Sequence, residues 1–419
     1  MNRSGQMEKS YTPRILLYSH DTYGLGHLRR TLAIASQLAL DLPDASQLLI
    51  TGSMVAGAFD LPPHLDLIKL PSLTKRTDGR YMARGLPLSL DATIAWRKQM
   101  ILQAAIAFEP DLVLVDKTPA GVQGELLPTL RHLKSWRPAT RLILGMRDIE
   151  DDPKATCAEW EASDTRRLHE EVYDNLLFYG EREVFDPVRE YAMSWMAAEK
   201  LVPCGYLGGA RPARCRETLR RELGAGDRPL IVVTVGGGGD GFGLLKAYLD
   251  ALASDQALAG AHSLVVTGPL MTRSKRGFLR NMARGEHVQQ LKFTPDLVSY
   301  LAAADLVVSM AGYNTVCEIL SLGVRALLVP RVRPRQEQRL RAQLLAERGL
   351  VRVLLPNDLS PERLASEIQA ALNSPPPKVT LNLDGLGRAS RAIIKFLDDG
   401  APKLSAPCTT GSNGHRRAE

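Results

Sequence analysis

Short apolar runs alternate with helix-length stretches along most of this chain, and this alternation constrains the fold more than any other feature. Residues 14–20 read RILLYSH and residues 230–238 read LIVVTVGGG. Similar runs occupy residues 46–52, 65–71, 111–116, 141–148, 175–181, 200–206, 262–268, 288–293, 305–310, 326–330 and 351–356. Continuous Val, Leu and Ile strands separated by helices are typical of parallel sheets that are buried on both faces. The sequence therefore predicts an α/β fold.

The runs fall into two groups, which predict two doubly wound, Rossmann-like domains. We expect an N-terminal domain over residues 14–206, a Gly-, Arg- and Pro-rich linker over 207–229, a second domain over 230–375, a C-terminal helix over 376–400 and a disordered tail over 401–419. Ligands bind open sheets of this kind beyond the carboxyl ends of the strands. The loops directly after strands are therefore expected to face one another across a cleft.

The composition restricts the class of protein. The five cysteines lack a C-x-x-C spacing, which argues against a disulfide framework or a zinc site and favours a reducing compartment. The first residues, MNRSGQMEKSYTP, lack the apolar segment of a secretory signal, and the apolar runs are too short to span a bilayer. We therefore expect a cytoplasmic protein. Its net charge of +7 leaves nucleic acid, phosphorylated metabolites and an anionic membrane surface open as partners.

A glycine-rich loop follows the first strand-like run of the second half. Before a helical pattern begins, the run ends in Gly236, Gly237, Gly238 and Gly239. Glycines let main-chain N–H groups approach a ligand, and a helix N-terminus adds a positive dipole end. No Lys-Ser/Thr pair follows, which excludes a P-loop, and the next run ends at Gly268 where a dinucleotide site has an acid. The loop predicts a site for an anion such as a diphosphate, with a tight turn lacking any ligand as the alternative.

A second motif, ADLVVSMAGYNTVCEIL, occupies residues 304–320. Its strand-like part ends in a tight turn at Gly312, and we expect Asn314 or Thr315 to cap the helix that follows. Glu318 stands three residues after Thr315, which is the capping-box spacing. The same carboxylate could instead accept hydrogen bonds from the two hydroxyls of a ribose. The spacing leaves both interpretations of Glu318 open.

Polar residues crowd the end of the next strand-like run. Gln336, Glu337 and Gln338 stand there, and amides with a carboxylate suit the hydroxyls of a sugar. The arginines around them are Arg331, Arg333, Arg335, Arg339 and Arg341. We expect these arginines either to meet phosphate or to form a solvated helix face.

The first half has its own glycine loop, HDTYGLGHLRR over residues 20–30. Gly24 and Gly26 bracket a leucine, and His27 begins a helical pattern. A histidine titrates near neutral pH and suits a general base. The alternative is a helix-start residue that bonds to a neighbouring loop.

Together these four stretches resemble the GT-B glycosyltransferases, and most closely the peptidoglycan N-acetylglucosaminyltransferase (MurG-like) group of glycosyltransferase family 28. The shared features are the glycine loop of the second half, the ADLVVS-x-AG-x-x-T-x-x-E block, the L-x-x-P and Glu-Gln blocks before a helix that includes Ala342, and the opening G-L-G-H. The resemblance covers residue 14 to about residue 372 and implies two Rossmann-like domains that face a cleft.

The resemblance also implies where a nucleotide sugar binds. The residues that match the family's donor site are Gly236, Gly237, Gly238 and Gly239 at the diphosphate, Gly312, Tyr313, Asn314 and Thr315 at the phosphates and nucleoside, Glu318 at the ribose, Phe293 at the uracil edge, and Glu337 with Gln338 at the sugar. The chain departs from the family in three places, and the first is the N-terminal loop, where Asp21-Thr22-Tyr23 replaces a more glycine-rich run. Glu337 replaces one of a pair of glutamines, and Met310 stands where relatives often carry arginine.

The implied reaction is inverting, metal-independent transfer of a hexosyl group, of N-acetylglucosaminyl type, from a UDP-sugar to a hydroxyl acceptor. We expect no cofactor and no metal, because no Asp-x-Asp or histidine-carboxylate cluster is evident. The acceptor-side residues are His27 as the expected base, Asp116, Asp21 and His20 as its alternates, and the loop glycines Gly24 and Gly26. A lipid-linked acceptor and peripheral contact with the inner face of a membrane, through the basic stretch over residues 76–97, are further implications.

Three other functions compete with this interpretation. A UDP-sugar 2-epimerase or a UDP-sugar hydrolase would share the fold, although an epimerase needs several acid and base groups around one sugar carbon. A nicotinamide-dependent dehydrogenase is disfavoured by Gly268, which stands where an acid is needed. The third is a non-catalytic protein that binds a nucleotide sugar or RNA. RNA binding would need aromatic stacking platforms among the arginines, and these are absent. We therefore expect no nucleic-acid partner.

Overall fold

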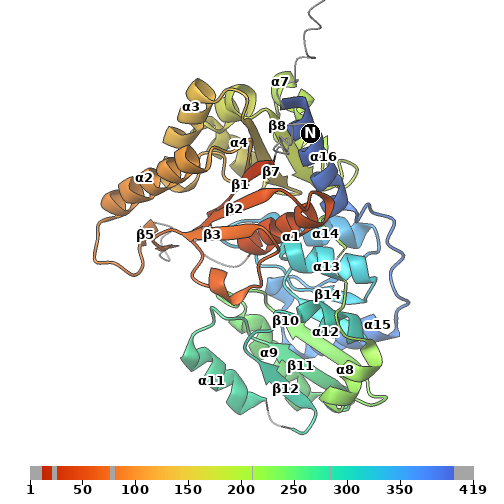
Figure 1. Ribbon diagram of the computed structural model, residues 1–419. Coiled ribbons are helices and arrows are strands. Elements are labelled where there is room, and N and C mark those ends of the chain that lie inside the picture. The colour runs from red at the N-terminus through yellow and green to blue at the C-terminus, as the bar shows by residue number, and fades with distance from the viewer. Residues whose placement is uncertain (1–11, 21–25, 76–80, 210, 284, 401–419) are drawn as a thin grey trace, which may run out of the picture.

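The computed structural model describes residues 12–20, 26–75, 81–209, 211–283 and 285–400, and its N-terminal part is built on a seven-stranded sheet (Figure 1). The strands of this sheet are β1 (Arg14–Ser19), β2 (Ser46–Thr51), β3 (Leu65–Lys69), β6 (Leu112–Asp116), β7 (Arg141–Arg147), β8 (Asn175–Tyr179) and β9 (Leu201–Pro203). They lie in the order β3-β2-β1-β6-β7-β8-β9, and every neighbouring pair is parallel.

The C-terminal part is built on a second parallel sheet of six strands in the order β12-β11-β10-β13-β14-β15. These strands are β10 (Leu230–Thr234), β11 (His262–Val266), β12 (Val288–Leu291), β13 (Leu306–Ser309), β14 (Ala326–Leu328) and β15 (Arg352–Val353). In each sheet the order reverses beside the first strand, between β1 and β6 and between β10 and β13. The prediction of two doubly wound α/β domains is confirmed.

Helices cover both faces of the N-terminal sheet. Alternate strand residues point to opposite faces, so Ile15 and Leu17 pack under α1 and α16, while Leu16 and Val113 pack under α2 and α3. The helices of this domain are α1 (Gly26–Asp41), α2 (Leu90–Phe108), α3 (Leu127–Trp136), α4 (Pro153–Glu161), α5 (Thr165–Arg167), α6 (Pro187–Glu190) and α7 (Trp195–Glu199), with a π-helical turn at Leu168–Val172.

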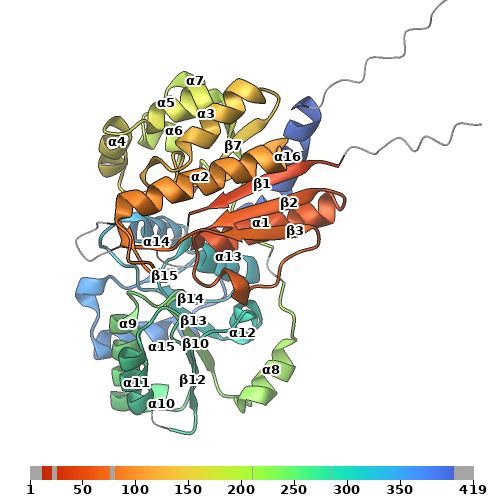
Figure 2. The same cartoon turned by 60° about the vertical axis from the view of Figure 1, so that its left-hand side comes forward.

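The C-terminal sheet is covered in the same way. On one face α9, α11 and α15 bury Val233 and Val308, and on the other α8, α12, α13 and α14 bury Val232 and Val307. The helices of this domain are α8 (Arg216–Leu223), α9 (Phe242–Ser254), α10 (Gln256–Ala259), α11 (Arg273–Met282), α12 (Leu297–Ala303), α13 (Tyr313–Leu322), α14 (Glu337–Glu347) and α15 (Pro361–Asn373). Figures 1 and 2 both place α13 and α14 at the junction of the two domains.

The end of the described chain returns to the N-terminal domain. Helix α16 (Gly385–Gly400) carries apolar residues at a spacing of four, Ala389, Ile393 and Leu397, and these join the core beneath α1 (Figure 1). The predicted linker contains α8, which packs on the C-terminal sheet through Leu219 and Leu223. The chain therefore crosses between the domains twice.

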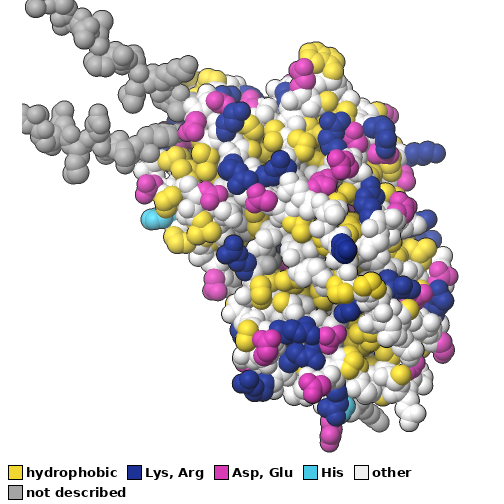
Figure 3. Space-filling view, turned by 90° about the vertical axis from the view of Figure 1, so that its right-hand side faces the viewer, with side chains coloured by type: hydrophobic (Ala, Val, Ile, Leu, Met, Phe, Trp, Pro, Cys, Tyr) yellow, Lys and Arg dark blue, Asp and Glu magenta, His cyan; other side chains and the backbone are white. Residues whose placement is uncertain are grey.

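Two further features of the surface bear on function. A short antiparallel hairpin, β4 (Leu73–Lys75) with β5 (Tyr81–Ala83), stands apart from the two sheets and was not predicted. On the face drawn in Figure 3, Lys and Arg side chains are interspersed with Asp and Glu. Across the described ranges, no helix is both long and apolar enough to cross a membrane.

Candidate functional site

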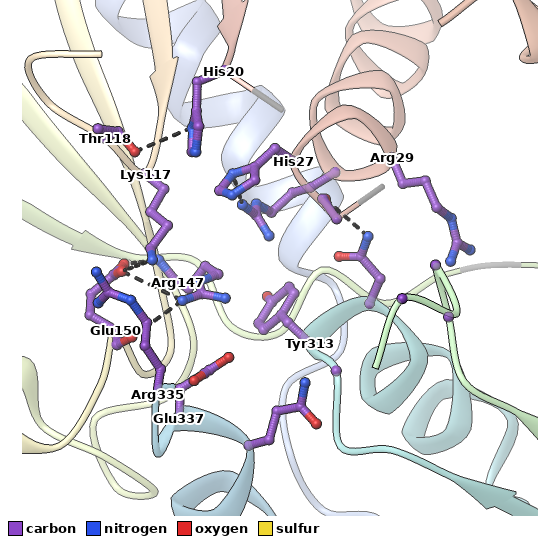
Figure 4. A pocket seen from close by; sticks show the side chains of 18 of the residues that line it. His20, His27, Arg29, Lys117, Thr118, Arg147, Glu150, Tyr313, Arg335 and Glu337 are labelled. Atoms are coloured by element: carbon purple, nitrogen blue, oxygen red, sulfur yellow. Dashed lines mark hydrogen bonds and ion pairs between the residues drawn. The ribbon is translucent and has the colours of Figure 1, made fainter. Parts of the chain in front are cut away.

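A cleft of 1330 Å³ lies where the carboxyl ends of the central strands of both sheets meet. Its walls include the loops after β1, β6 and β7 of one domain and after β10, β13 and β14 of the other. The two points at which the strand order reverses thus open into the same cavity, which is where open α/β sheets bind ligands. Figure 4 shows side chains from both domains converging there.

His27 is held by a carboxylate at the start of α1. Its Nδ1 lies 2.5 Å from Oδ2 of Asp116, the last residue of β6. Arg30, one turn further along α1, donates two hydrogen bonds of 2.7 and 2.6 Å to the same carboxylate. A carboxylate can only accept, so Nδ1 of His27 carries the proton and Nε2 is left as the acceptor. This is the tautomer that a general base requires.

The charge of Asp116 is fixed by its partners. Burial alone would raise the pKa of this carboxyl, but the Arg30 guanidinium and the His27 ring outweigh burial and hold it well below its usual range. The side chains of Arg30 and Asp116 are only 2% and 4% exposed. Asp116 is therefore an ionised positioning group and does not itself exchange protons near neutral pH, so its candidacy as an alternate base is not favoured.

His20 lies beside His27 at the end of β1. The two ring centroids are 4.1 Å apart, and Nδ1 of His20 is 3.2 Å from the hydroxyl of Thr118. Burial, followed by the charges of His27 and Lys117, holds the pKa of His20 well below its usual value. His20 is thus a neutral ring that packs against His27. The predicted residues Asp21 and Gly24 lie outside the described residues.

The glycine loop after β10 lines the opposite wall of the cleft. Gly238 has a φ of +85°, and a Cβ there would lie 2.1 Å from the carbonyl oxygen of Thr267. A Cβ at Gly268 would lie 2.5 Å from the carbonyl oxygen of Gly236. No side chain fits at this position, including the acidic one that a dinucleotide site requires. Helix α9 then begins without a side-chain cap. The N–H of Gly238 donates to the carbonyl oxygen of Val235 at 3.1 Å, so an anion here would meet the other main-chain N–H groups of the loop, and the predicted anion site stays a prediction.

The predicted cap of α13 is wrong. Gly312 occupies the N-cap position without a side-chain hydrogen bond, and Thr315 is buried within the first turn. Asn314 instead donates through Nδ2 to the carbonyl oxygen of Gly26, 3.1 Å away in the other domain. No side chain therefore caps the main-chain N–H groups in the first turn of α13, because Asn314 is bonded to the other domain.

The capping-box interpretation of Glu318 is also wrong. Its carboxylate forms an ion pair with Arg29 of α1, and it is 7% exposed. The remaining oxygen, Oε2, has no hydrogen-bond partner within the described chain. Buried carboxylate oxygens rarely stay unpartnered, so this atom has unused capacity to accept a hydrogen bond.

Phe293, Glu337 and Gln338 all line the cleft, together with Met310. The ring of Phe293 meets the edge of Phe59 from the N-terminal domain, with centroids 6.0 Å apart. Glu337 accepts a 2.6 Å hydrogen bond from Arg331. Burial would raise the pKa of Glu337, but nearby arginines, Arg147 and Arg331 foremost, lower it to about 2. Glu337 therefore enters the cleft as a carboxylate.

Arg341 has a different role from the one expected. It is neither solvated nor directed at phosphate, because it is buried and donates hydrogen bonds of 2.7 and 2.6 Å to Asp148 of the N-terminal domain. The guanidiniums of Arg30 and Arg341 both contact the ring of Tyr313, each 5.6 Å from its centroid. Together these contacts join the two domains at the floor of the cleft.

A group of charged residues beside His27 was missed by the sequence predictions. Nζ of Lys117 is 3.1 Å from Oε2 of Glu150, and Arg147 lies 3.6 Å from the same oxygen. Both cations stand at the ends of strands, Lys117 directly after Asp116 and Arg147 at the end of β7. The sequence DLVLVDKTP could have indicated Lys117, because this residue directly follows Asp116 at the end of a strand. Both residues therefore lie at the same edge of the sheet.

The C-terminal domain is similar in sequence to known glycosyltransferases. Residues 231–382 match the family model described as the glycosyltransferase family 28 C-terminal domain. Among curated proteins, the UDP-N-acetylglucosamine–N-acetylmuramyl-(pentapeptide) pyrophosphoryl-undecaprenol N-acetylglucosamine transferase of Corynebacterium efficiens is 31% identical over 170 residues. These residues are 40% of this chain and 44% of that protein. The chain matches no more than half of the length of its curated relatives.

Two solved glycosyltransferase structures resemble this chain in fold over more than nine-tenths of its length. The calicheamicin glycosyltransferase CalG4 superposes with a TM-score of 0.58 at 17% identity, covering 94% of this chain and 100% of that one. MurG of Acinetobacter baumannii superposes with a TM-score of 0.54 at 15% identity, covering 92% and 99%. The predicted GT-B fold and the resemblance to MurG-like glycosyltransferases are confirmed.

Proposed function

Because residues 231–382 carry a family 28 C-terminal domain and the chain has the GT-B fold, we propose that this protein transfers a hexosyl group from a UDP-sugar to a hydroxyl acceptor. One observation carries the proposal. The glycine loop at residues 236–239 and the His27–Asp116 pair line the same cleft from opposite domains. A diphosphate on the loop and a hydroxyl at His27 would bring the two reactants together.

The donor side supplies hydrogen bonds and positive charge to the leaving UDP. We assign the diphosphate to the main-chain N–H groups of the glycine loop and of the first turn of α13. The ribose is assigned to the free oxygen of Glu318, the uracil to Phe293, and the sugar to Glu337 with Gln338. Each of these residues lines the cleft or has a polar atom left for a ligand. Such main-chain donors stabilise negative charge without reorganisation.

The acceptor side supplies the base. In the proposed reaction the acceptor oxygen attacks the anomeric carbon of the sugar while the bond from that carbon to the β-phosphate oxygen breaks. The hydroxyl proton passes to Nε2 of His27, and the resulting imidazolium is stabilised by Asp116. A single displacement of this kind inverts the anomeric carbon. The main-chain donors assigned to the leaving group support a reaction without a metal.

The other partners belong to the same proposal. Three large apolar residues are exposed in the N-terminal domain, Leu86 and Leu88 just before α2 and Trp96 on α2 itself. We assign them to peripheral contact with a membrane that presents a lipid-linked acceptor. The expected N-acetylglucosaminyl donor rests on the likeness of residues 231–382 to family 28.

Ligand-dependent thermal unfolding tests the proposal. UDP at micromolar concentration is expected to raise the melting temperature, because it binds only the folded cleft, whereas NAD is expected to have no effect. UDP-N-acetylglucosamine should protect as well, and its cleavage should depend on an added acceptor. A protein that no uridine nucleotide stabilises would refute the donor assignment. Sugar isomerisation without transfer would show an epimerase instead.

A further inference from the structure

Lys117 and Arg147 form a cationic pair on the acceptor side of the cleft. Figure 4 shows Lys117 beside Glu150, with Arg147 pointing toward the middle of the cleft. Both side chains are mostly buried, with 15% and 13% exposure. Neither residue has been given a part in the transfer reaction above. Long cations are rarely buried in a cavity unless they are paired or bind something.

One carboxylate serves both cations. Glu150 accepts from Lys117 at 3.1 Å, while the guanidinium of Arg147 is 3.6 Å from Glu150 Oε2 and 3.3 Å from its carbonyl oxygen. The neighbouring Arg335 is paired with Glu159 at 3.0 Å and lies 3.6 Å from Asp151. Glu337 is a further carboxylate near Arg147, but it is paired with Arg331 at 2.6 Å, so Lys117 and Arg147 together carry one positive charge that Glu150 does not balance.

The guanidinium of Arg147 has unused hydrogen-bonding capacity. A guanidinium presents five N–H donors, and only the Nη2 atom of Arg147 contacts Glu150. Its Nε is buried and has no partner among the described residues. A buried donor without a partner costs free energy, and an oxyanion is the ligand that a guanidinium binds best.

The backbone and the electrostatics agree with a site for an anion. Lys117 has a φ of +67°, an unusual conformation for a residue with a side chain, and its N–H is tied to the carbonyl oxygen of Gly145 at 2.8 Å. Burial and the charge of Arg147 outweigh Glu150 and lower the pKa of Lys117 to about 8. An anionic ligand beside the ammonium would offset both the burial and the charge of Arg147.

The position of the pair indicates which substrate carries that anion. Lys117 follows Asp116 in the chain, and Asp116 holds His27, so the pair lies beside the base and on the N-terminal domain. The glycine loop, to which the donor diphosphate is assigned, belongs to the other domain. An acceptor with its hydroxyl at His27 would extend its neighbouring groups toward Lys117 and Arg147.

We propose that Lys117 and Arg147 form a subsite for an oxyanion, a carboxylate or a phosphate, carried by the hydroxyl acceptor. The assignment of this anion to the acceptor rests on the proposed function, whereas the binding of an oxyanion at this place does not. Glu150 is the internal counterion that keeps the two cations charged and oriented until the acceptor arrives.

Direct binding tests the subsite without turnover. The intact protein is first saturated with UDP, so that the glycine loop is occupied, and is then titrated with glucose, glucuronate or glucose 6-phosphate in a calorimeter. Glucuronate and glucose 6-phosphate are expected to bind at least about tenfold more tightly than glucose, since bonds to charged groups are the strong ones. Tighter binding of glucuronate would identify a carboxylate subsite, and tighter binding of glucose 6-phosphate a phosphate subsite.

Variants separate the subsite from a merely structural cluster. Arg147→Gln and Lys117→Gln should each lower the affinity for the charged sugars severalfold and leave that for glucose unchanged. Glu150→Gln removes the competing carboxylate and should raise the affinity for both charged sugars, whereas a structural role would predict loss. Arg189→Gln, at an exposed residue of α6, is the matched control and should change none of the three affinities.

The outcomes are distinct. Equal affinities for the three sugars in the wild-type protein, or affinities for charged sugars that do not change in Arg147→Gln, would overturn the subsite. If Arg147→Gln fails to fold, an unchanged or weaker affinity in Glu150→Gln overturns it. Failure of UDP to stabilise the wild-type protein would count against the proposed transferase. The subsite would still be tested, because the affinities for charged and neutral sugars can be compared between the wild type and the variants.

Discussion

Substitution of Asp116 by Asn tests how His27 and Arg30 are held. The carboxylate makes three contacts, two hydrogen bonds of 2.7 and 2.6 Å with Arg30 and one of 2.5 Å with His27. The amide cannot balance the Arg30 charge, and the Arg30 side chain is only 2% exposed. Breaking a buried ion pair by removing one partner costs about 3–5 kcal/mol. For a domain of this size that loss lowers the melting temperature by about 6–20 °C.

The dependence on pH follows from the same contact. The folded pKa of Asp116 is depressed below its unfolded value of about 3.9, so its contribution to stability is complete above that pH and is lost as the pH falls through the folded pKa. Asp116→Asn should therefore lose stability at neutral pH and show a weaker acid dependence. Affinity for UDP should not change, because the donor residues belong to the other domain.

Thermal unfolding with two reference variants measures this effect. Asp384→Asn removes a carboxylate from a solvent-exposed arginine pair, in which Arg391 is 2.6 Å away, and should change the melting temperature little. The double variant Arg30→Met/Asp116→Asn removes the uncompensated charge and should recover much of the loss. A melting temperature for Asp116→Asn within a degree or so of wild type would refute the buried-pair reasoning, since even 1 kcal/mol would move it by about 2–4 °C.

Three further changes have defined outcomes. Glu318→Ala should weaken UDP binding by about tenfold or more and remove the preference for UDP over its 2′-deoxy analogue, as calorimetry would show; unchanged affinity would mean that Glu318 only pairs with Arg29. Arg341→Met should leave Asp148 buried without a counterion and lower the free energy of unfolding in urea by about 3–5 kcal/mol, and an unchanged urea midpoint would contradict the assigned role. Glucuronate affinity should fall as the pH rises through about 8, because Lys117 loses its proton there; an affinity that stays constant across this pH would argue against Lys117 as a ligand.

The fold could be predicted because its signal is local. The central strands β1, β6 and β10 are nearly continuous apolar runs, and burial on both faces requires that pattern. The hairpin of β4 and β5 could not be found in this way, because strands of three residues contain too little pattern. The return of α16 to the N-terminal domain was also not predicted, since an amphipathic helix does not specify which surface it covers.

The candidate site could be predicted where it depends on strand ends. His27, Asp116 and the glycine loop come together because parallel strands place their carboxyl ends at one edge. Contacts between the domains were missed, since Arg29 lies 289 residues from Glu318 and Arg341 lies 193 residues from Asp148. Spacing along one helix suggested that Asn314 and Glu318 cap α13. Asn314 instead bonds to Gly26, and Glu318 pairs with Arg29, both in the other domain.

The central claim is that this cleft transfers a sugar from a UDP-sugar with His27 as the base. Wild-type protein and His27→Gln are incubated with a panel of UDP-sugars and a total lipid extract, and mass spectrometry detects the glycosylated products. The account predicts transfer by the wild type, a loss of about 10²–10⁴-fold in His27→Gln, and equal affinity of both proteins for UDP. A fully active His27→Gln variant would contradict it.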